Sequence, residues 1–113
     1  QHKAAKVGFD WPDISGALDK VGEELAEVRE AAKSGDPDHC QEELGDLLFA
    51  VVNVSRFLHV EPEQALSLAC NKFIGRFAGV EKLAAERGID MEKSSLEELD
   101  RLWDEVKRKE KSV

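Results

Sequence analysis

The residues Ser34-Gly35-Asp36-Pro37 decide the fold of this chain, because they form a very short link between two long helical patterns. Glycine readily adopts the left-handed conformation that ends many helices, so Gly35 is expected to end the first helix. Aspartate is a favoured N-cap and proline a favoured first helical residue, so Asp36-Pro37 is expected to begin the second. Two helices joined so closely must pack as antiparallel neighbours.

Apolar residues on both sides of this link follow helical spacing. The first helix is expected to run from Pro12 or Asp13 to Ser34, and the second from Pro37 to about Leu58. The two apolar stripes are Ile14, Leu18, Val21, Leu25, Val28 and Ala32, then Cys40, Leu44, Leu47, Val51, Val54 and Leu58. Each stripe repeats every three or four residues, which places it on one face of an α-helix.

Two more helices are expected downstream. Pro62 begins a third helix that ends near Gly88, and Ser95-Leu96-Glu97-Glu98 is a capping box that opens a fourth. No stretch alternates apolar and polar residues over the length of a strand. Residues 1–113 are therefore expected to form one all-α domain, a four-helix bundle. A chain of this size buries a modest core, so association with a partner subunit is expected.

Charge and composition limit the partners of the chain. Sixteen Lys and Arg oppose 24 Asp and Glu, which gives a net charge of −8. That surplus repels the phosphates of nucleic acids and the surfaces of anionic membranes, so neither is expected as a partner. The chain has no run of 18 apolar residues and no signal-peptide core, and Cys40 and Cys70 lack metal-site spacing. A reducing, cytoplasmic location is therefore expected.

Two pairs of acids stand out, because each is spaced i,i+3 on an expected helix: Glu24 with Glu27, and Glu43 with Asp46. At about 100° per residue, the first pair lies about 80° and 140° from its apolar stripe, and the second about 60° and 120°. Both pairs are displaced from their stripes in the same rotational direction. When the two helices pack antiparallel, both pairs therefore lie on the same side of the helix pair. The two pairs also lie at the same height along the helices. The first pair lies 8 and 11 residues before Gly35, and the second lies 7 and 10 residues after Asp36.

Four carboxylates at one level repel one another unless protons or a cation neutralise them. With no His or Cys in either pair, the oxygen ligands favour a hard ion, Mg²⁺ or Mn²⁺, over zinc. No Glu has a His three residues later, which disfavours a di-iron site. The alternative is that these acids are solvated residues on the flanks of their helices.

A Mg²⁺ ion held mainly by carboxylates commonly binds substrate phosphates as well, and phosphates need positively charged partners. Lys20 lies one turn before the first acidic pair, and Lys72 and Arg76 lie one turn apart on the third helix, where the alternative is a solvated face. Trp103, with Lys107 one turn beyond it, is either a core residue or a plate on which a base stacks. No glycine-rich phosphate loop or catalytic nucleophile is recognisable.

Three segments carry most of these residues in a characteristic order. They are Glu23-Glu24-Leu25-Ala26-Glu27, Glu42-Glu43-Leu44-Gly45-Asp46-Leu47-Leu48-Phe49-Ala50 and Lys72-Phe73-Ile74-Gly75-Arg76-Phe77. In order and spacing they resemble the MazG-type nucleoside triphosphate pyrophosphohydrolases. The resemblance extends from Ala4-Ala5-Lys6-Val7-Gly8-Phe9-Asp10-Trp11 to Trp103-Asp104-Glu105-Val106-Lys107-Arg108. The opening stretch is similar to the start of the C-terminal domain in two-domain members, which would explain the missing initiator Met.

The resemblance implies an all-α, dimeric enzyme that hydrolyses nucleoside triphosphates to monophosphates and pyrophosphate with Mg²⁺. By position, the implied metal ligands are Glu24, Glu27, Glu43 and Asp46. The implied substrate-binding residues are Lys20, Lys72, Arg76, Trp103 and Lys107. Glu23 or Glu24 is the candidate for accepting the proton of the attacking water. Many relatives carry Asn two residues before the motif lysine, where this chain has Cys70, so the sugar or base contact of that Asn is in question.

Two alternatives stay open at this point. One is a related all-α pyrophosphohydrolase with a narrower substrate, such as dUTP, dCTP or phosphoribosyl-ATP. The other is a non-catalytic helical module for dimerisation or regulation, which would have no physical need for four clustered acids.

Overall fold

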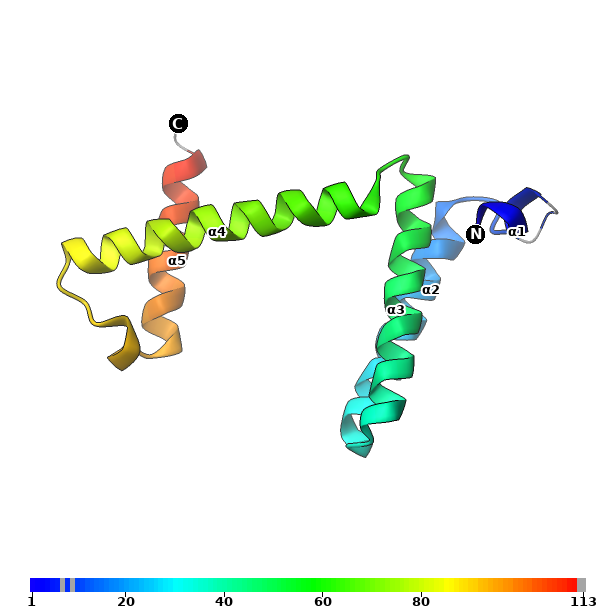
Figure 1. The fold of residues 1–113 in the computed structure, drawn as a ribbon, viewed down its shortest axis with the longest axis horizontal. Coiled ribbons are helices and arrows are strands. Elements are labelled where there is room, and N and C mark those ends of the chain that lie inside the picture. The colour runs from blue at the N-terminus through cyan, green and yellow to red at the C-terminus, as the bar shows by residue number, and fades with distance from the viewer. Residues whose placement is uncertain (7, 9, 112–113) are drawn as a thin grey trace. The chain divides into compact units, whose positions relative to one another are not determined.

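The computed structural model describes residues 1–6, 8 and 10–111 of the chain (Figure 1). Its helices are α1 (His2–Lys6), α2 (Ile14–Ser34), α3 (Pro37–Phe57), α4 (Pro62–Glu86), the 3₁₀ turn η1 (Met91–Lys93) and α5 (Leu96–Lys111). No strand occurs among the described residues, so the all-α prediction is confirmed. The four long helices are the four expected ones. The sequence pattern does not predict α1 or η1, because five and three residues are too few to show helical periodicity.

Two residues of the stretch that resembles the MazG-type enzymes, Val7 and Phe9, lie outside the described residues. Within the described part of the chain, none of the helices could span a lipid bilayer on grounds of length and hydropathy.

The link between α2 and α3 has the expected geometry. Gly35 ends α2 with a φ of 71°, in the left-handed region. The Asp36 side chain accepts a hydrogen bond from the backbone N–H of Asp38 at 3.1 Å, and Pro37 takes the first helical position of α3. The two helices consequently lie side by side and antiparallel (Figure 1).

The chain divides into two compact units, Gln1–Pro62 and Glu63–Val113, and each is described by itself. In the first unit, small side chains make the contact between α2 and α3. Its buried apolar residues, among those described, are Ala17, Ala31 and Ala50. Alanines let the two helices approach closely but bury little apolar area. Several large residues of the two apolar stripes, such as Leu25 and Leu44, remain more than 40% exposed.

The segment before α2 lies against both helices of the first unit. Trp11 packs on the first turn of α2, where Gly16 leaves room for the indole: a Cβ there would lie 2.9 Å from Trp11 Cε3. The Gln1 side chain donates from Nε2 to the backbone carbonyl oxygen of Phe49 on α3, at 3.1 Å. The segment thereby forms one wall of the region beside α2 and α3.

The second unit has a core of larger side chains, formed where α4 packs against α5. Its buried residues are Val80, Leu83, Ala84, Leu102 and Val106. Ser95 Oγ accepts a hydrogen bond from the backbone N–H of Glu98 at 3.2 Å, as the capping box predicts. Arg87, just after α4, donates to both carboxylate oxygens of Glu105 on α5 at 2.7 and 2.6 Å. These hydrogen bonds hold the pKa of Glu105 below its usual value.

Replacing Gly35 by alanine is expected to destabilise the protein by about 1 kcal/mol, because a Cβ strains the left-handed conformation. Gly35→Asn is expected to lose less, since asparagine tolerates that conformation better. Free energies of unfolding from urea titration measure both changes. Equal losses for the two variants would contradict the helix cap as the source of the effect.

Candidate metal centre

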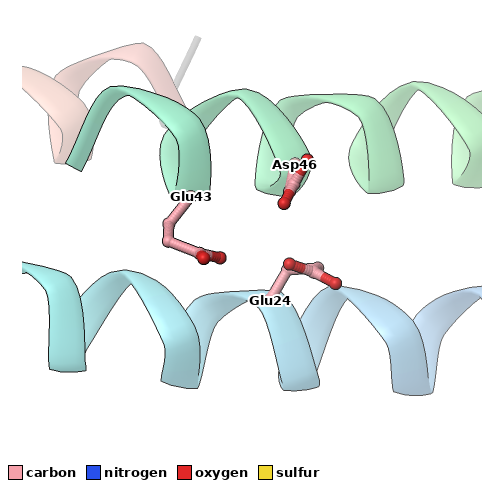
Figure 2. Close-up of side chains that lie close together, drawn as sticks. All are labelled: Glu24, Glu43 and Asp46. Carbon is pink, nitrogen blue, oxygen red and sulfur yellow. The ribbon is translucent and has the colours of Figure 1, made fainter. Parts of the chain in front are cut away.

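Three carboxylates from α2 and α3 converge between the two helices. One oxygen each of Glu24, Glu43 and Asp46 lies within 4.8 Å of the other two (Figure 2). Glu24 is buried, with 9% of its surface exposed, whereas Glu43 is half-buried and Asp46 is exposed. The short link fixes the register of α2 against α3, and this register places the three acids at one height.

Glu27, the fourth predicted ligand, lies one turn beyond Glu24 and is exposed. It does not belong to the three converging groups, but its charge acts on one of them. The pKa of Glu43 is raised, first by loss of solvation and then by the negative charges of Asp46 and Glu27. His39, whose Nε2 lies 3.5 Å from Glu43 Oε1, acts in the opposite direction. Additional positive charge beside these carboxylates would therefore stabilise their ionised forms.

Lys20 supplies positive charge to the cluster from one turn earlier on α2. Its Nζ lies 2.9 Å from Glu24 Oε1 and 3.6 Å from Glu23 Oε2. The hydrogen bond from Lys20 to Glu24, together with the charge of that carboxylate, raises the pKa of Lys20. The Glu23 side chain is 69% exposed. Three predicted site residues of α2 are thus neighbours in the structure.

The donor set of the cluster fits a hard divalent cation. All three converging groups are carboxylates, which act only as acceptors when ionised, and none is a His or Cys. Mg²⁺ is usually held by a few carboxylates, and waters or phosphates complete its shell. A divalent cation would also relieve the repulsion that raises the pKa of Glu43.

A cavity of about 720 Å³ adjoins the cluster within the first unit. Glu24, Asp46 and Lys20 contribute to its lining, so the acidic cluster opens into it. Its other lining residues on α3 and on the segment before α2 include Phe49, Ala50, Asn53, Arg56, Asp10 and Trp11. The α3 members lie 3, 4, 7 and 10 positions after Asp46, which is the spacing of a single helix face.

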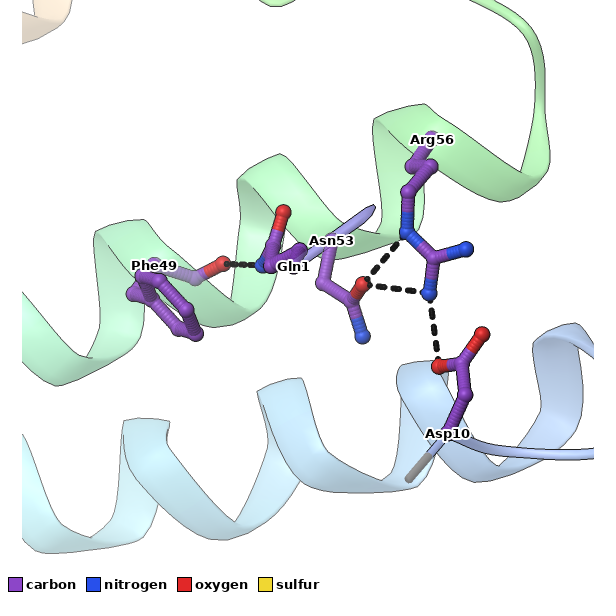
Figure 3. A network of polar contacts seen from close by, with 5 residues as sticks. All are labelled: Gln1, Asp10, Phe49, Asn53 and Arg56. Carbon is purple, nitrogen blue, oxygen red and sulfur yellow. Dashed lines mark hydrogen bonds and ion pairs between the residues drawn. The ribbon is translucent and has the colours of Figure 1, made fainter. Parts of the chain in front are cut away.

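Arg56 forms hydrogen bonds with its neighbours at the end of the cavity wall that lies farthest along α3 from the acids. Its Nη2 donates to Asp10 Oδ1 at 2.6 Å and to Asn53 Oδ1 at 2.9 Å, and its Nε donates to the same Asn53 oxygen at 3.1 Å (Figure 3). The hydrogen bond from Arg56 holds the pKa of Asp10 below its usual value. The Arg56 guanidinium also lies 4.7 Å from the ring centroid of Phe57.

This network was not predicted from the sequence. The helical spacing from Asp46 could have indicated Asn53 and Arg56 as residues of the same face. Asp10 gave no such signal, because it lies 46 residues from Arg56 in a segment without helical periodicity.

Four of the predicted site residues lie in the second unit: Lys72, Arg76, Trp103 and Lys107. Lys72 is exposed on α4, and Arg76 donates from Nε to Glu110 Oε2 of α5 at 3.0 Å. Trp103 packs against the core of this unit, with its ring centroid 5.3 Å from that of Phe73, and stays partly exposed. Trp103 therefore makes the contacts expected of a core residue, and its ring also stays accessible, as stacking on a base would require.

Fold and site together define an α-helical protein whose paired acidic helices suit a divalent cation beside a ligand-sized cavity. The family profile described as the MazG nucleotide pyrophosphohydrolase domain matches residues 15–80. The chain belongs to this family.

Relatives of known name are similar over nearly the whole chain. A Thermotoga maritima protein named nucleoside triphosphate pyrophosphohydrolase/pyrophosphatase MazG is 47% identical over 107 residues, which cover 95% of this chain and 41% of that protein. An Escherichia coli K12 protein named nucleoside triphosphate pyrophosphohydrolase is 44% identical over 112 residues, covering 97% of this chain and 43% of that protein. The chain thus spans about two fifths of the length of these relatives.

Replacing Glu43 by glutamine is expected to raise the Tm of the protein in EDTA and to abolish the further rise that Mg²⁺ produces. The change removes one charge from the repelling cluster and one charged ligand from the cation site. Thermal unfolding in EDTA and across titrations of Mg²⁺ and Mn²⁺ measures both effects.

Glu30→Gln is the matched control, because Glu30 is an exposed glutamate of α2 that pairs with Lys33. This variant is expected to keep the wild-type response to Mg²⁺. A Glu43→Gln protein that Mg²⁺ stabilises as strongly as the wild type would contradict the cation site.

Proposed function

We propose that this chain hydrolyses nucleoside triphosphates to nucleoside monophosphates and pyrophosphate with Mg²⁺, for which Mn²⁺ can substitute. The observation that carries this proposal is the convergence of Glu24, Glu43 and Asp46 beside a cavity of nucleotide size, which Glu24 and Asp46 line. The names of the Thermotoga and Escherichia relatives support the same reaction.

In this proposal the cation is held by Glu24, Glu27, Glu43 and Asp46. When bound, it supplies Lewis-acid chemistry, making water more acidic and polarising phosphate oxygens. Glu23 or Glu24 would accept the proton of the water attacking the α-phosphorus. Lys20, which contacts both, would bind a phosphate oxygen and offset the charge that develops on the leaving pyrophosphate.

Four residues of the second unit are proposed substrate contacts because they match the motifs of the MazG family. Lys72 and Arg76 are proposed to bind phosphates, and Trp103 with Lys107 to line the nucleotide site. Because Arg76 donates to Glu110 in the structure, a substrate phosphate would replace a carboxylate as its acceptor.

We further propose that the chain acts as a homodimer. In the first unit, the described buried apolar residues are alanines, whereas Leu44, Leu48 and Val51 of α3 are 49%, 58% and 45% exposed. These three positions recur every three or four residues and therefore form one apolar face. A second copy of the chain packed on this face would bury it and complete a four-helix arrangement.

Leu48→Glu is expected to convert the dimer into a monomer, because it places a charge in the centre of the proposed interface. Sedimentation velocity measures the change. Leu96→Glu is the control, since Leu96 is a 73% exposed leucine on the other unit. A wild-type chain that sediments as a monomer would contradict the proposal.

Incubation of the purified chain with Mg²⁺ and a panel of nucleoside triphosphates is expected to yield the monophosphate and pyrophosphate, separable by ion-exchange chromatography. EDTA and Glu43→Gln are each expected to lower kcat by 100-fold or more, on the order of the loss of one main electrostatic contribution, whereas Glu30→Gln keeps wild-type turnover. Release of orthophosphate and diphosphate would assign a different bond, and turnover confined to dUTP, dCTP or phosphoribosyl-ATP would identify a narrower enzyme.

A further inference from the structure

The wall of the cavity beyond the acidic cluster has no role in the phosphate chemistry proposed above. It combines the polar network of Asp10, Asn53 and Arg56 (Figure 3) with the aromatic side chains of Trp11 and Phe49. A polar group with a fixed orientation beside aromatic surface is the usual composition of a site that binds a heterocyclic ring.

Hydrogen bonds to Arg56 fix the orientation of the Asn53 amide. Its Oδ1 accepts from both Nε and Nη2 of Arg56, at 3.1 and 2.9 Å. A flipped amide would bring its NH₂ group against these two N–H donors, so the carbonyl oxygen must face Arg56. Asp10 Oδ1 accepts a further hydrogen bond from the same Nη2 at 2.6 Å. The Asn53 amino group consequently points away from Arg56, as Figure 3 shows.

The distance from the acids suits a nucleoside. Asn53 lies seven residues after Asp46 on the same face of α3, which corresponds to about 10.5 Å along the helix axis. That separation is comparable to the span from the α-phosphate across the ribose to the base. With the phosphates at the cation site, the base therefore comes to the level of Asn53, between the walls that Trp11 and Phe49 contribute.

We infer that Asn53 reads the base of the substrate, donating a hydrogen bond from Nδ2 to a ring carbonyl oxygen. Uracil, thymine, cytosine and guanine carry such an oxygen. Adenine offers only ring nitrogens as acceptors, and its 6-amino group finds no acceptor on Asn53, because Oδ1 already accepts two hydrogen bonds from Arg56. The chain therefore prefers nucleotides with carbonyl-bearing bases over adenine nucleotides. Asp10 and Arg56 are positioning residues, because they act through the orientation of the Asn53 amide. The effect on hydrolysis rests on the proposed function, whereas binding of the base to Asn53 does not.

The test is Asn53→Asp, which keeps an acceptor oxygen for Arg56 and removes the N–H donor. Relative to wild type, kcat/KM for UTP, CTP and GTP is expected to fall about tenfold or more, because the base carbonyl loses its hydrogen-bond donor. The value for ATP is expected to stay or rise, since the 6-amino group can donate to the new carboxylate. Gln41→Glu is the control, because it makes the same amide-to-carboxylate change at an exposed position of α3 outside the cavity and should leave every rate unchanged.

Substitution of the positioning residue Arg56 is expected to give a different kinetic pattern. Arg56→Lys retains the positive charge beside Asp10 but loses the pair of donors that orients the amide. Its KM for UTP is expected to rise towards that for ATP, with kcat for both close to wild type. An equal fall of kcat on every nucleotide would indicate a merely structural role for Arg56.

Several outcomes would overturn the inference. They are a wild-type preference for ATP, or an equal loss on all bases in Asn53→Asp protein whose circular dichroism is native. Should Asn53→Asp fail to fold, Asn53→Ala supplies the same comparison, with loss on carbonyl-bearing bases expected and no gain for ATP. If no nucleotide is hydrolysed, the proposed function fails, and calorimetric titration with UMP and AMP decides the base subsite: weaker UMP binding in the variant supports it, and unchanged UMP binding overturns it.

Discussion

The register between α2 and α3 is the constraint on which the rest of the site depends. Gly35 and Asp36 alone separate the two helices, so neither can slide along the other without breaking its cap. A shift of one helical turn, about 5.4 Å, would move Glu24 out of reach of Glu43 and Asp46 together. The same register sets the cavity, because Lys20 and Trp11 on one side and Asn53 on the other keep fixed levels relative to the acids.

The elements that the sequence predicts correctly are those with local signals. Caps such as Asp36-Pro37 act within a few residues, and apolar periodicity identifies a helix without reference to the rest of the fold. The angular offsets from the apolar stripes also anticipate which acids face the helix contact. Glu24 and Glu43 have the smaller offsets and are buried or half-buried, whereas Asp46 and Glu27 have the larger offsets and are exposed.

What the sequence could not predict depends on contacts between distant segments. The pair formed by Asp10 and Arg56 requires the segment before α2 to lie against α3, and no spacing in the sequence encodes that placement. The apolar stripes were recognisable, but their burial was not. Alanines at positions 17, 31 and 50 are buried, whereas leucines of the stripes such as Leu25 and Leu44 stay exposed. Periodicity identifies the apolar face of a helix, but it does not identify the surface that covers it.

The cavity contains two acid–base pairs of different rigidity, and the difference matches the work that the proposed function assigns to each. Lys20 meets Glu24 through one ammonium group on a side chain that is 45% exposed, so the pair can exchange partners when cation and phosphate bind. Arg56 is 18% exposed and makes three hydrogen bonds to Asp10 and Asn53, so its geometry is set before a ligand arrives. Phosphates change charge and partners during hydrolysis, whereas a base does not. The mobile ammonium group of Lys20 therefore suits the reacting phosphates, whereas the Asn53 amide that Arg56 holds in place suits recognition of the base.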